Sequence, residues 1–264
     1  IDTEPLLEPS LVQLLIWTSH YYLHPPGEVL PLAFSPRERR GEPSASTGVA
    51  GIMLNARGAG LPHGALARAK KQARLLALLQ QRPHTFDELK AQGISRAIAR
   101  ELVAKNLAIL CDIDLPGSWI ARAPLRATAE QRHAIEAINQ TFGHFSCHLL
   151  EGITGSGKTE VYLQCAAQAI ERGQQVLILL PEIGLTPQMV ERFKARFQAP
   201  IITLHSGLSD GERDRHWSMA RKGAAAIILG TRSSVFVPTR NLGLIIVDEE
   251  HDGSYNQQDG LRYR

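Results

Sequence analysis

The sequence has few cysteines, no long apolar run and no signal peptide, and each of these absences excludes a class of protein. The 264 residues contain three cysteines, Cys111, Cys147 and Cys165, and no Cys-x-x-Cys pair, so we expect neither a disulfide framework nor a zinc site. The longest apolar runs, such as residues 224–230, are too short to span a bilayer. The chain has no initiator methionine and no signal peptide. We therefore expect a soluble, cytoplasmic protein without membrane contact, whose thiols are at least partly buried.

A phosphate-binding loop is the strongest pattern present. Residues 152–159 follow Gly-x-x-x-x-Gly-Lys-Thr, which wraps backbone N–H groups around a polyphosphate. Lys158 is expected to contact the outer phosphates and Thr159 to hold Mg²⁺. The helix that follows points its positive end at the anion. The predicted ATP-binding residues are Gln131, Gly152, Thr154, Gly155, Ser156, Gly157, Lys158 and Thr159.

A second pattern is an apolar strand that ends in acids, Leu-Ile-Ile-Val-Asp-Glu-Glu-His at residues 244–251. Asp248 is predicted to hold Mg²⁺, and Glu249 to orient and deprotonate the attacking water. His251 can relay the state of the nucleotide to a nucleic acid site. The predicted catalytic residues are therefore Lys158, Asp248 and Glu249, and the predicted Mg²⁺ ligands are Thr159 and Asp248.

Gln131 has two readings. Thr128 and Gln131 have the spacing of a capping box, in which each side chain bonds to the backbone N–H of the other. The alternative is that Gln131 also reads the edge of the adenine. The sequence leaves both readings open.

Polar turns after other predicted strands suggest how the site contacts DNA. Thr186 caps a helix with N–H groups free for a phosphate, and Thr231 with Arg232 can clamp a strand backbone. Segment 252–264 has little apolar content, and a flexible aromatic loop there can stack bases and reposition Glu249. Ordinary turns and a surface loop are the alternatives. The predicted coupling or DNA-binding residues are Thr186, Thr231, Arg232, His251, Tyr255, Gln257, Arg262 and Tyr263.

Residues 121–264 alternate between strand and helix patterns. Strands are predicted over 148–151, 175–180, 201–204, 225–229 and 244–247, and helices over 158–172, 186–197 and 210–222. Continuous apolar strands joined by helices predict an α/β fold with a parallel sheet covered on both faces.

The preceding residues predict smaller modules. Helices over 65–81, 86–92 and 95–106, followed by a hairpin that pairs 107–112 with 119–120, indicate a winged-helix domain. Residues 61–110 hold nine Lys or Arg against three Asp or Glu, which favours a nucleic acid partner although the net charge is only +3. A spacer or a protein-docking surface is the alternative. The weak candidates for DNA contact are Arg96, Arg100 and Lys105.

The N-terminal part is expected to be incomplete. Residues 41–64 have the composition of a linker with at most one strand, 49–54. Residues 1–40 contain one amphipathic helix with little to pack on, so we expect the end of a module whose beginning is missing. The aromatic cluster of Trp17, Tyr21 and Tyr22 is expected to be a buried face, with base stacking as the alternative.

Together, the segments GITGSGKTEVYL, LLPEIGLTPQ, LHSGLSDGER, GTRSSVF and IIVDEEHDGSYNQQDGLRYR resemble the primosomal protein N′ family, the PriA-type replication-restart DNA helicases of superfamily 2. The resemblance covers residues 121–264 and is looser before them. It implies a RecA-like first helicase lobe at 121–264, a winged-helix domain at 65–120, a linker at 41–64, and the C-terminal part of a 3′-DNA-binding domain at 1–40.

The resemblance also implies an activity. Its members use ATP and Mg²⁺ to unwind DNA 3′→5′ at abandoned forks and start primosome assembly. The implied ligands are forked and single-stranded DNA. The implied partners are primosome proteins, single-stranded DNA-binding protein and the proteins that load the replicative helicase, in the bacterial cytoplasm at the nucleoid.

This sequence departs from the family in several ways. It lacks a second motor lobe, an arginine finger and a cysteine-rich segment, so zinc is expected only in a missing C-terminal part. We therefore expect an excerpt that hydrolyses ATP very slowly on its own. Open alternatives are a translocase that does not separate strands and a non-catalytic fork-binding module. A small-molecule P-loop kinase is disfavoured because no acceptor pocket is evident.

Overall fold

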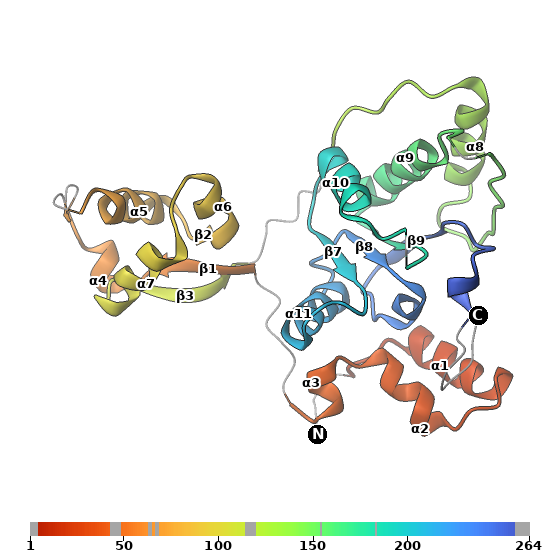
Figure 1. The fold of residues 1–264 in the computed structure, drawn as a ribbon, viewed down its shortest axis with the longest axis horizontal. Coiled ribbons are helices and arrows are strands. Elements are labelled where there is room, and N and C mark those ends of the chain that lie inside the picture. Colours follow the sequence, from red (N-terminus) through yellow and green to blue (C-terminus); the bar gives the residue numbers. More distant parts are fainter. Residues whose placement is uncertain are drawn as a thin grey trace. The chain divides into compact units, whose positions relative to one another are not determined.

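The structure, a computed structural model, describes residues 5–42, 49–62, 65–66, 69–113, 120–153, 155–182 and 184–256. These residues divide into two compact units with separate hydrophobic cores (Figure 1). Unit 1 comprises the described residues of segments 1–45 and 117–264, and unit 2 those of segment 46–116. None of the helices in the described ranges is long and apolar enough to span a bilayer.

A parallel sheet forms the centre of unit 1. Its strands in spatial order are β7 (Ile201–Leu204), β8 (Ile227–Gly230), β5 (Gln175–Leu179) and β9 (Leu242–Val247). Every residue of β5 is buried, as expected for a strand between two covered faces. The predicted α/β fold with a parallel sheet is therefore confirmed.

Helices cover both faces of this sheet (Figure 1). They are α8 (Ala129–Asn139), α9 (Lys158–Glu171), α10 (Pro187–Arg196) and α11 (Asp210–Arg221). Val176 and Ile178 of β5 share a cluster with residues of α9 and α10, whereas Leu177 and Leu179 share one with residues of α11. This alternation follows from the period of two in a strand. α8 packs on α9 through Ile135 and the buried Cys165.

The strand predicted over residues 148–151 is not present. These residues have no regular secondary structure, and Leu149 is 75% exposed. The segment offers two consecutive leucines, too little apolar surface for burial to favour a strand strongly. The nearby Cys147 is exposed, against the expectation of a partly buried thiol.

Unit 2 combines short helices with an antiparallel sheet in the order β2-β1-β3. The strands are β1 (Val49–Leu54), β2 (His84–Thr85) and β3 (Ala108–Ile113), and the helices are α4 (Ala56–Ala59), α5 (Lys70–Gln81), α6 (Phe86–Ala91) and α7 (Arg96–Ala104). Ile52, Leu75 and Leu102 are fully buried in its core.

One prediction about this region is wrong. β3 pairs with β1 instead of forming a hairpin with residues 119–120, and β4 (Ile120–Ala121) pairs with β6 (Phe197–Gln198) of unit 1. The one strand predicted within segment 41–64, over residues 49–54, is present as β1 and supplies Ile52 to the core, and the linker assigned to the rest of the segment stays a prediction. The burial of Ile52 and Leu54 favours a strand here over the flexibility that the flanking glycines suggest.

The N-terminal residues form α1 (Pro9–Tyr21), α2 (Pro26–Val29), the 3₁₀ helix η1 (Leu30–Ala33) and α3 (Pro36–Arg39). Leu15, Val29 and Ala33 share a buried cluster with Phe236 of the 3₁₀ helix η2 (Arg232–Phe236), so this segment does have a surface to pack on. The expected burial of the aromatic cluster is wrong for two of its rings. Trp17 and Tyr21 stack with centroids 4.7 Å apart and are 52% and 64% exposed.

Candidate active site

The phosphate-loop sequence bends sharply before α9. Gly155 and Gly157 have φ values of +82° and +86°, in a region that L side chains rarely adopt. A Cβ on Gly157 would overlap the side-chain amide of Gln131, and one on Gly152 would press on the Ser156 hydroxyl. Bare backbone at these positions is therefore a geometric requirement, as a loop that cradles phosphates needs.

Lys158 lies between the loop and an acid. Its Nζ donates to the carbonyl oxygen of Gly152 at 2.6 Å and lies 3.7 Å from Oε1 of Glu249. The ammonium is thus shared by two oxygens. A phosphate that enters the loop would compete with both for this charge.

Asp248 is held by its backbone and its side chain. Its N–H donates to the carbonyl of Leu179 at 3.0 Å, which extends the β5–β9 ladder by one residue. Its Oδ1 accepts a hydrogen bond from the Tyr162 hydroxyl at 3.0 Å. Burial, reinforced by the negative charge of Asp248, raises the pKa of Tyr162, so the hydroxyl stays protonated and continues to donate.

The backbone changes direction at the next residue. Glu249 has a φ of +47°, which is uncommon for a residue other than glycine. Its second oxygen, Oε2, lies 3.5 Å from Nε2 of His251. Glu249 thus faces Lys158 with one oxygen and His251 with the other.

Tyr255, in the 3₁₀ helix η3 (Gly253–Tyr255), differs from its predicted role in an exposed aromatic loop. It is 6% exposed, and its hydroxyl lies 3.0 Å from the carbonyl of Leu179 and 2.8 Å from that of Asp248. Burial raises the pKa of Tyr255, so its hydroxyl remains a donor. The ring packs in the core because it fills space beside β5, and it cannot stack on a base in this position.

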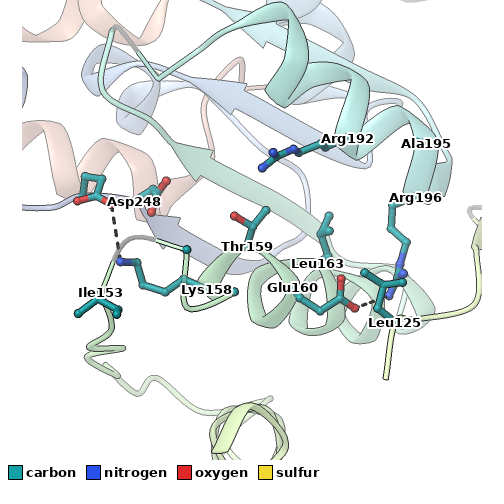
Figure 2. A pocket seen from close by; sticks show the side chains of 13 residues that line it. Leu125, Ile153, Lys158, Thr159, Glu160, Leu163, Arg192, Ala195, Arg196 and Asp248 are labelled. Carbon is teal, nitrogen blue, oxygen red and sulfur yellow. Dashed lines mark hydrogen bonds and ion pairs between the residues drawn. The ribbon is translucent and has the colours of Figure 1, made fainter. Parts of the chain in front are cut away.

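One cleft of about 780 Å³ joins these parts (Figure 2). Its lining includes Gly155, Gly157, Thr159 and the two acids Asp248 and Glu249. The predicted Mg²⁺ ligands, Thr159 and Asp248, therefore share one space. A hydroxyl and a carboxylate are hard oxygen donors that suit Mg²⁺, which needs few protein ligands when phosphates and waters complete its shell.

The far end of the cleft contains residues that the sequence analysis missed. Arg196 pairs with Glu160 at 3.1 Å and donates to the carbonyl of Ala123 at 2.9 Å, and both charged side chains are largely buried. Arg192 also lines the cleft from α10 (Figure 2). The position of Tyr162, three residues after Thr159 and so on the same side of α9, is the one sequence signal that could have identified a missed residue.

The capping box at Gln131 is confirmed. Its backbone N–H donates to the Thr128 hydroxyl at 3.2 Å, and its Oε1 accepts from the Thr128 N–H at 2.9 Å. Its Nε2 also donates to the carbonyl of Ser156 at 3.2 Å, so the cap is tied to the loop. Reading of adenine by Gln131 stays a prediction.

The predicted coupling residues lie at several places in unit 1. Thr186 caps α10 as predicted, and its hydroxyl accepts from the Met189 N–H at 3.3 Å. Thr231 is 8% exposed, and Arg232 donates to the carbonyl of Ser254 at 2.7 Å. Four predicted site residues lie outside the described residues, namely Thr154, Gln257, Arg262 and Tyr263.

The weak DNA-contact candidates lie in unit 2. Arg96 and Arg100 are exposed on α7, and Lys105 caps its C-terminal end. The Arg96 guanidinium stacks over the Phe86 ring at 4.8 Å, and Lys105 Nζ donates to Gln72 at 2.6 Å. These cations belong to unit 2, whereas the residues that line the cleft belong to unit 1.

Comparisons with known proteins agree with this geometry. A family model described as DEAD/DEAH box helicase matches residues 128–263, just over half of the chain. A second, described as 3′DNA-binding domain, matches residues 1–35. Both family matches fall on segments of unit 1.

Curated relatives extend the similarity to the whole chain. It is 42% identical over 275 residues to the replication restart protein PriA of Haemophilus influenzae, covering 100% of this chain and 37% of the relative. It is 35% identical over 273 residues to that of Chlamydia pneumoniae, covering 98% of this chain and 36% of the relative. It is 46% identical over 142 residues to that of Bacillus subtilis, covering 53% of this chain and 18% of the relative. The chain thus spans well under half the length of these relatives.

Proposed function

The chain belongs to the DEAD/DEAH box helicase family, and from this premise we propose that its cleft binds and hydrolyses ATP. The observation that supports this best is that Lys158, Thr159 and the acid pair line one space, although they come from α9 and from the end of β9. Hydrolysis needs a cation at the phosphates and a carboxylate near the attacking water. This cleft contains both.

Each residue has a distinct proposed role. The loop N–H groups and Lys158 bind the phosphates, while Glu249 orients the attacking water and accepts its proton. Thr159 and Asp248 would hold Mg²⁺, which supplies charge neutralisation at the phosphates. Tyr162 and Tyr255 keep Asp248 in place through its carboxylate and its carbonyl. Gln131 contacts the adenine in addition to capping α8.

We further propose that hydrolysis drives DNA unwinding with 3′→5′ polarity at stalled replication forks, followed by primosome assembly. Three relatives named replication restart protein PriA and the match to a 3′DNA-binding domain support this proposal. Thr186, Thr231, Arg232, His251, Gln257, Arg262 and Tyr263 are the proposed DNA contacts in unit 1. Arg96, Arg100 and Lys105 are the proposed contacts in unit 2.

The proposed partners and location are those that the resemblance to the primosomal protein N′ family implies. The partners are single-stranded DNA-binding protein, primosome proteins and loaders of the replicative helicase, and the proposed location is the bacterial cytoplasm at the nucleoid. We propose that the 264-residue chain alone turns over slowly, because the cleft is lined from one lobe and its Lys158 is engaged by Glu249. Rapid DNA-stimulated turnover by the 264 residues would contradict this.

The test is ATP hydrolysis with and without single-stranded DNA, by this chain and by the full-length protein that contains it. We expect DNA-stimulated hydrolysis by the full-length protein and its loss, by about a hundredfold or more, in Lys158→Ala. Lys194→Ala is the matched control, since Lys194 pairs with Glu191 on its own helix, at the surface. Hydrolysis that persists in Lys158→Ala would refute the proposed site.

Unwinding needs a separate assay. A forked duplex with a labelled strand should be separated only when ATP is present. Separation should also require that the strand along which the protein would move 3′→5′ is unbroken. Hydrolysis without strand separation would instead indicate a translocase. Fork binding with no hydrolysis would indicate a non-catalytic module.

A further inference from the structure

We propose that the N-terminal segment is a positioning element for the motor, docked on one face of α11, and that this contact sets how strongly DNA stimulates hydrolysis. The inference rests on the proposed function, because it concerns how the same cleft is controlled. The docking face consists of Asp210, Asp214, Trp217 and Arg221. These four residues recur at helical spacing, so they lie along one side of the helix.

Each residue of the docking face contacts residues 33–40. Asp214 Oδ1 accepts from the Arg37 N–H at 3.0 Å, and Trp217 Nε1 donates to the carbonyl of Ala33 at 3.0 Å. Arg221 pairs with Glu38 at 2.5 Å. At the N-terminal end of α11, Arg40 pairs with Asp210 at 3.4 Å. The contact is thus continuous along three turns of the helix.

The centre of this contact excludes water. Asp214 is 2% exposed, and the Glu38 side chain is 4% exposed. Glu38 also accepts from the Ser35 N–H at 2.9 Å, within the capping box of α3. Buried carboxylates are costly unless they are paired, so this set of contacts is expected to be made together or lost together.

The docked segment also packs against η2, which carries Arg232. Phe236 of η2 is 2% exposed and shares its cluster with Leu15, Val29 and Ala33. On its other side, η2 is pressed against the sheet, because a Cβ on Gly230 would collide with the Ser234 side chain. η2 is therefore held between the N-terminal segment and β8.

A chain of hydrogen bonds continues from η2 to the acid pair. Arg232 donates to the carbonyl of Ser254, and the next residue, Tyr255, bonds to the carbonyl of Asp248 at 2.8 Å. Ser254 and Tyr255 both belong to η3. A shift of η2 would therefore act on η3, and a shift of η3 on the backbone of Asp248.

This path joins two segments that the comparisons assign to different domains. Residues 1–35 match a 3′DNA-binding domain, and the acid pair lies within the helicase match. Coupling along this path is measured as an effect on the distant element. We infer that Glu38, Asp214 and Trp217 are positioning residues, without contact to nucleotide.

Hydrogen exchange tests the path without requiring turnover. We expect Glu38→Gln and Trp217→Phe to raise amide exchange in residues 231–236 and 253–255 about three- to tenfold, with α9 unchanged. Glu38→Gln keeps the size of the side chain and removes the charge that pairs with Arg221, whereas Trp217→Phe removes the N–H donor together with part of the buried indole. Arg215→Gln is the control, since Arg215 is an exposed residue of α11 outside the docking face. Faster exchange confined to residues 33–40 and α11 would overturn the proposal.

The second readout is the hydrolysis rate of the full-length protein. In both variants the DNA-stimulated rate should fall about three- to tenfold, while the unstimulated rate and the KM for ATP stay at the values of the unmodified protein. A parallel fall of both rates would indicate simple destabilisation and refute a positioning role. Absence of hydrolysis in the unmodified protein would instead count against the proposed function, so the two failures are distinguishable.

Discussion

At the scale of single residues, Lys158 and Glu249 lie 3.7 Å apart, so the proposed nucleotide would compete with this carboxylate for one ammonium. Glu249→Gln removes the negative charge and frees Lys158 for phosphate. We expect ATP affinity to be kept or to rise, while hydrolysis falls about a hundredfold or more because the base is lost. Titration with a fluorescent ATP analogue and phosphate release measure the two effects.

Glu250→Gln is the matched control for this prediction. It makes the same chemical change one residue further along, in a side chain that does not line the cleft. If affinity and hydrolysis fall together in Glu249→Gln, then Glu249 helps to bind the nucleotide and is not the base.

Tyr255→Phe removes one buried hydroxyl and leaves the carbonyls of Leu179 and Asp248 with one donor fewer. We expect a loss of about 1 kcal/mol in the free energy of unfolding. For a protein of this size, that corresponds to a fall of about 2–4 °C in Tm. Tyr21→Phe is the control, because Tyr21 is 64% exposed. Equal Tm values for the two variants would contradict the role assigned to the Tyr255 hydroxyl.

At the scale of elements, the packing of α8 on α9 predicts a difference in thiol reactivity. Burial raises the pKa of Cys165 to about 11, so at pH 8 almost no reactive thiolate is present, whereas Cys147 is exposed. We expect a thiol reagent to label Cys147 rapidly and Cys165 only after unfolding or as the pH approaches 11. Mass spectrometry of the labelled peptides identifies each site.

The control for this prediction is Cys147→Ser, which should abolish the label on that peptide. Fast labelling of Cys165 at pH 8 would show that α8 and α9 separate readily in solution.

Elements with local signals were predicted correctly, and those that depend on distant partners were not. The spacing of glycines before Lys158 and the apolar run before Asp248 are local, so α9 and β9 were predicted from them. The pairing of β3 with β1 joins residues that are more than fifty positions apart, and the sequence of neither strand indicates which strand it pairs with. The same holds for the hydrogen bond from Tyr162 to Asp248, two residues that the sequence places 86 positions apart.

At the scale of the whole molecule, the two separate cores predict independent folding. Residues 46–116, expressed alone, should give one cooperative thermal transition. This is expected because Ile52, Leu75 and Leu102 pack against other residues of unit 2. Leu102→Ala should destabilise this unit by about 2–5 kcal/mol. Circular dichroism on heating measures both effects.

The exposed Leu110→Ala provides a control, since a side chain that is 60% exposed contributes little to the core. A gradual, non-cooperative loss of signal by residues 46–116 would show that unit 2 needs the rest of the chain to fold.

The domain boundaries show why the whole molecule was harder to predict than its parts. Glycine and proline around residues 41–64 indicated a linker with at most one strand, and nothing in that segment showed that this strand, β1, belongs to the core of unit 2. The N-terminal helices were expected to have little to pack on, yet they pack on α11 and η2. In both cases the segment is held in place because it buries apolar side chains against a partner that is remote in sequence. The amino-acid composition of a short segment does not reveal such a partner.

The left-handed backbone at Glu249 has a consequence for how this protein can be inhibited or impaired. Successive side chains of a strand alternate between opposite sides, yet Asp248 and Glu249 both border the same cleft. The kink at φ +47° interrupts that alternation just after β9. A β-branched replacement such as Val would therefore damage the candidate active site twice, through the missing charge and through a backbone that resists the turn, whereas Asn would tolerate the turn and lose the charge and one methylene of reach.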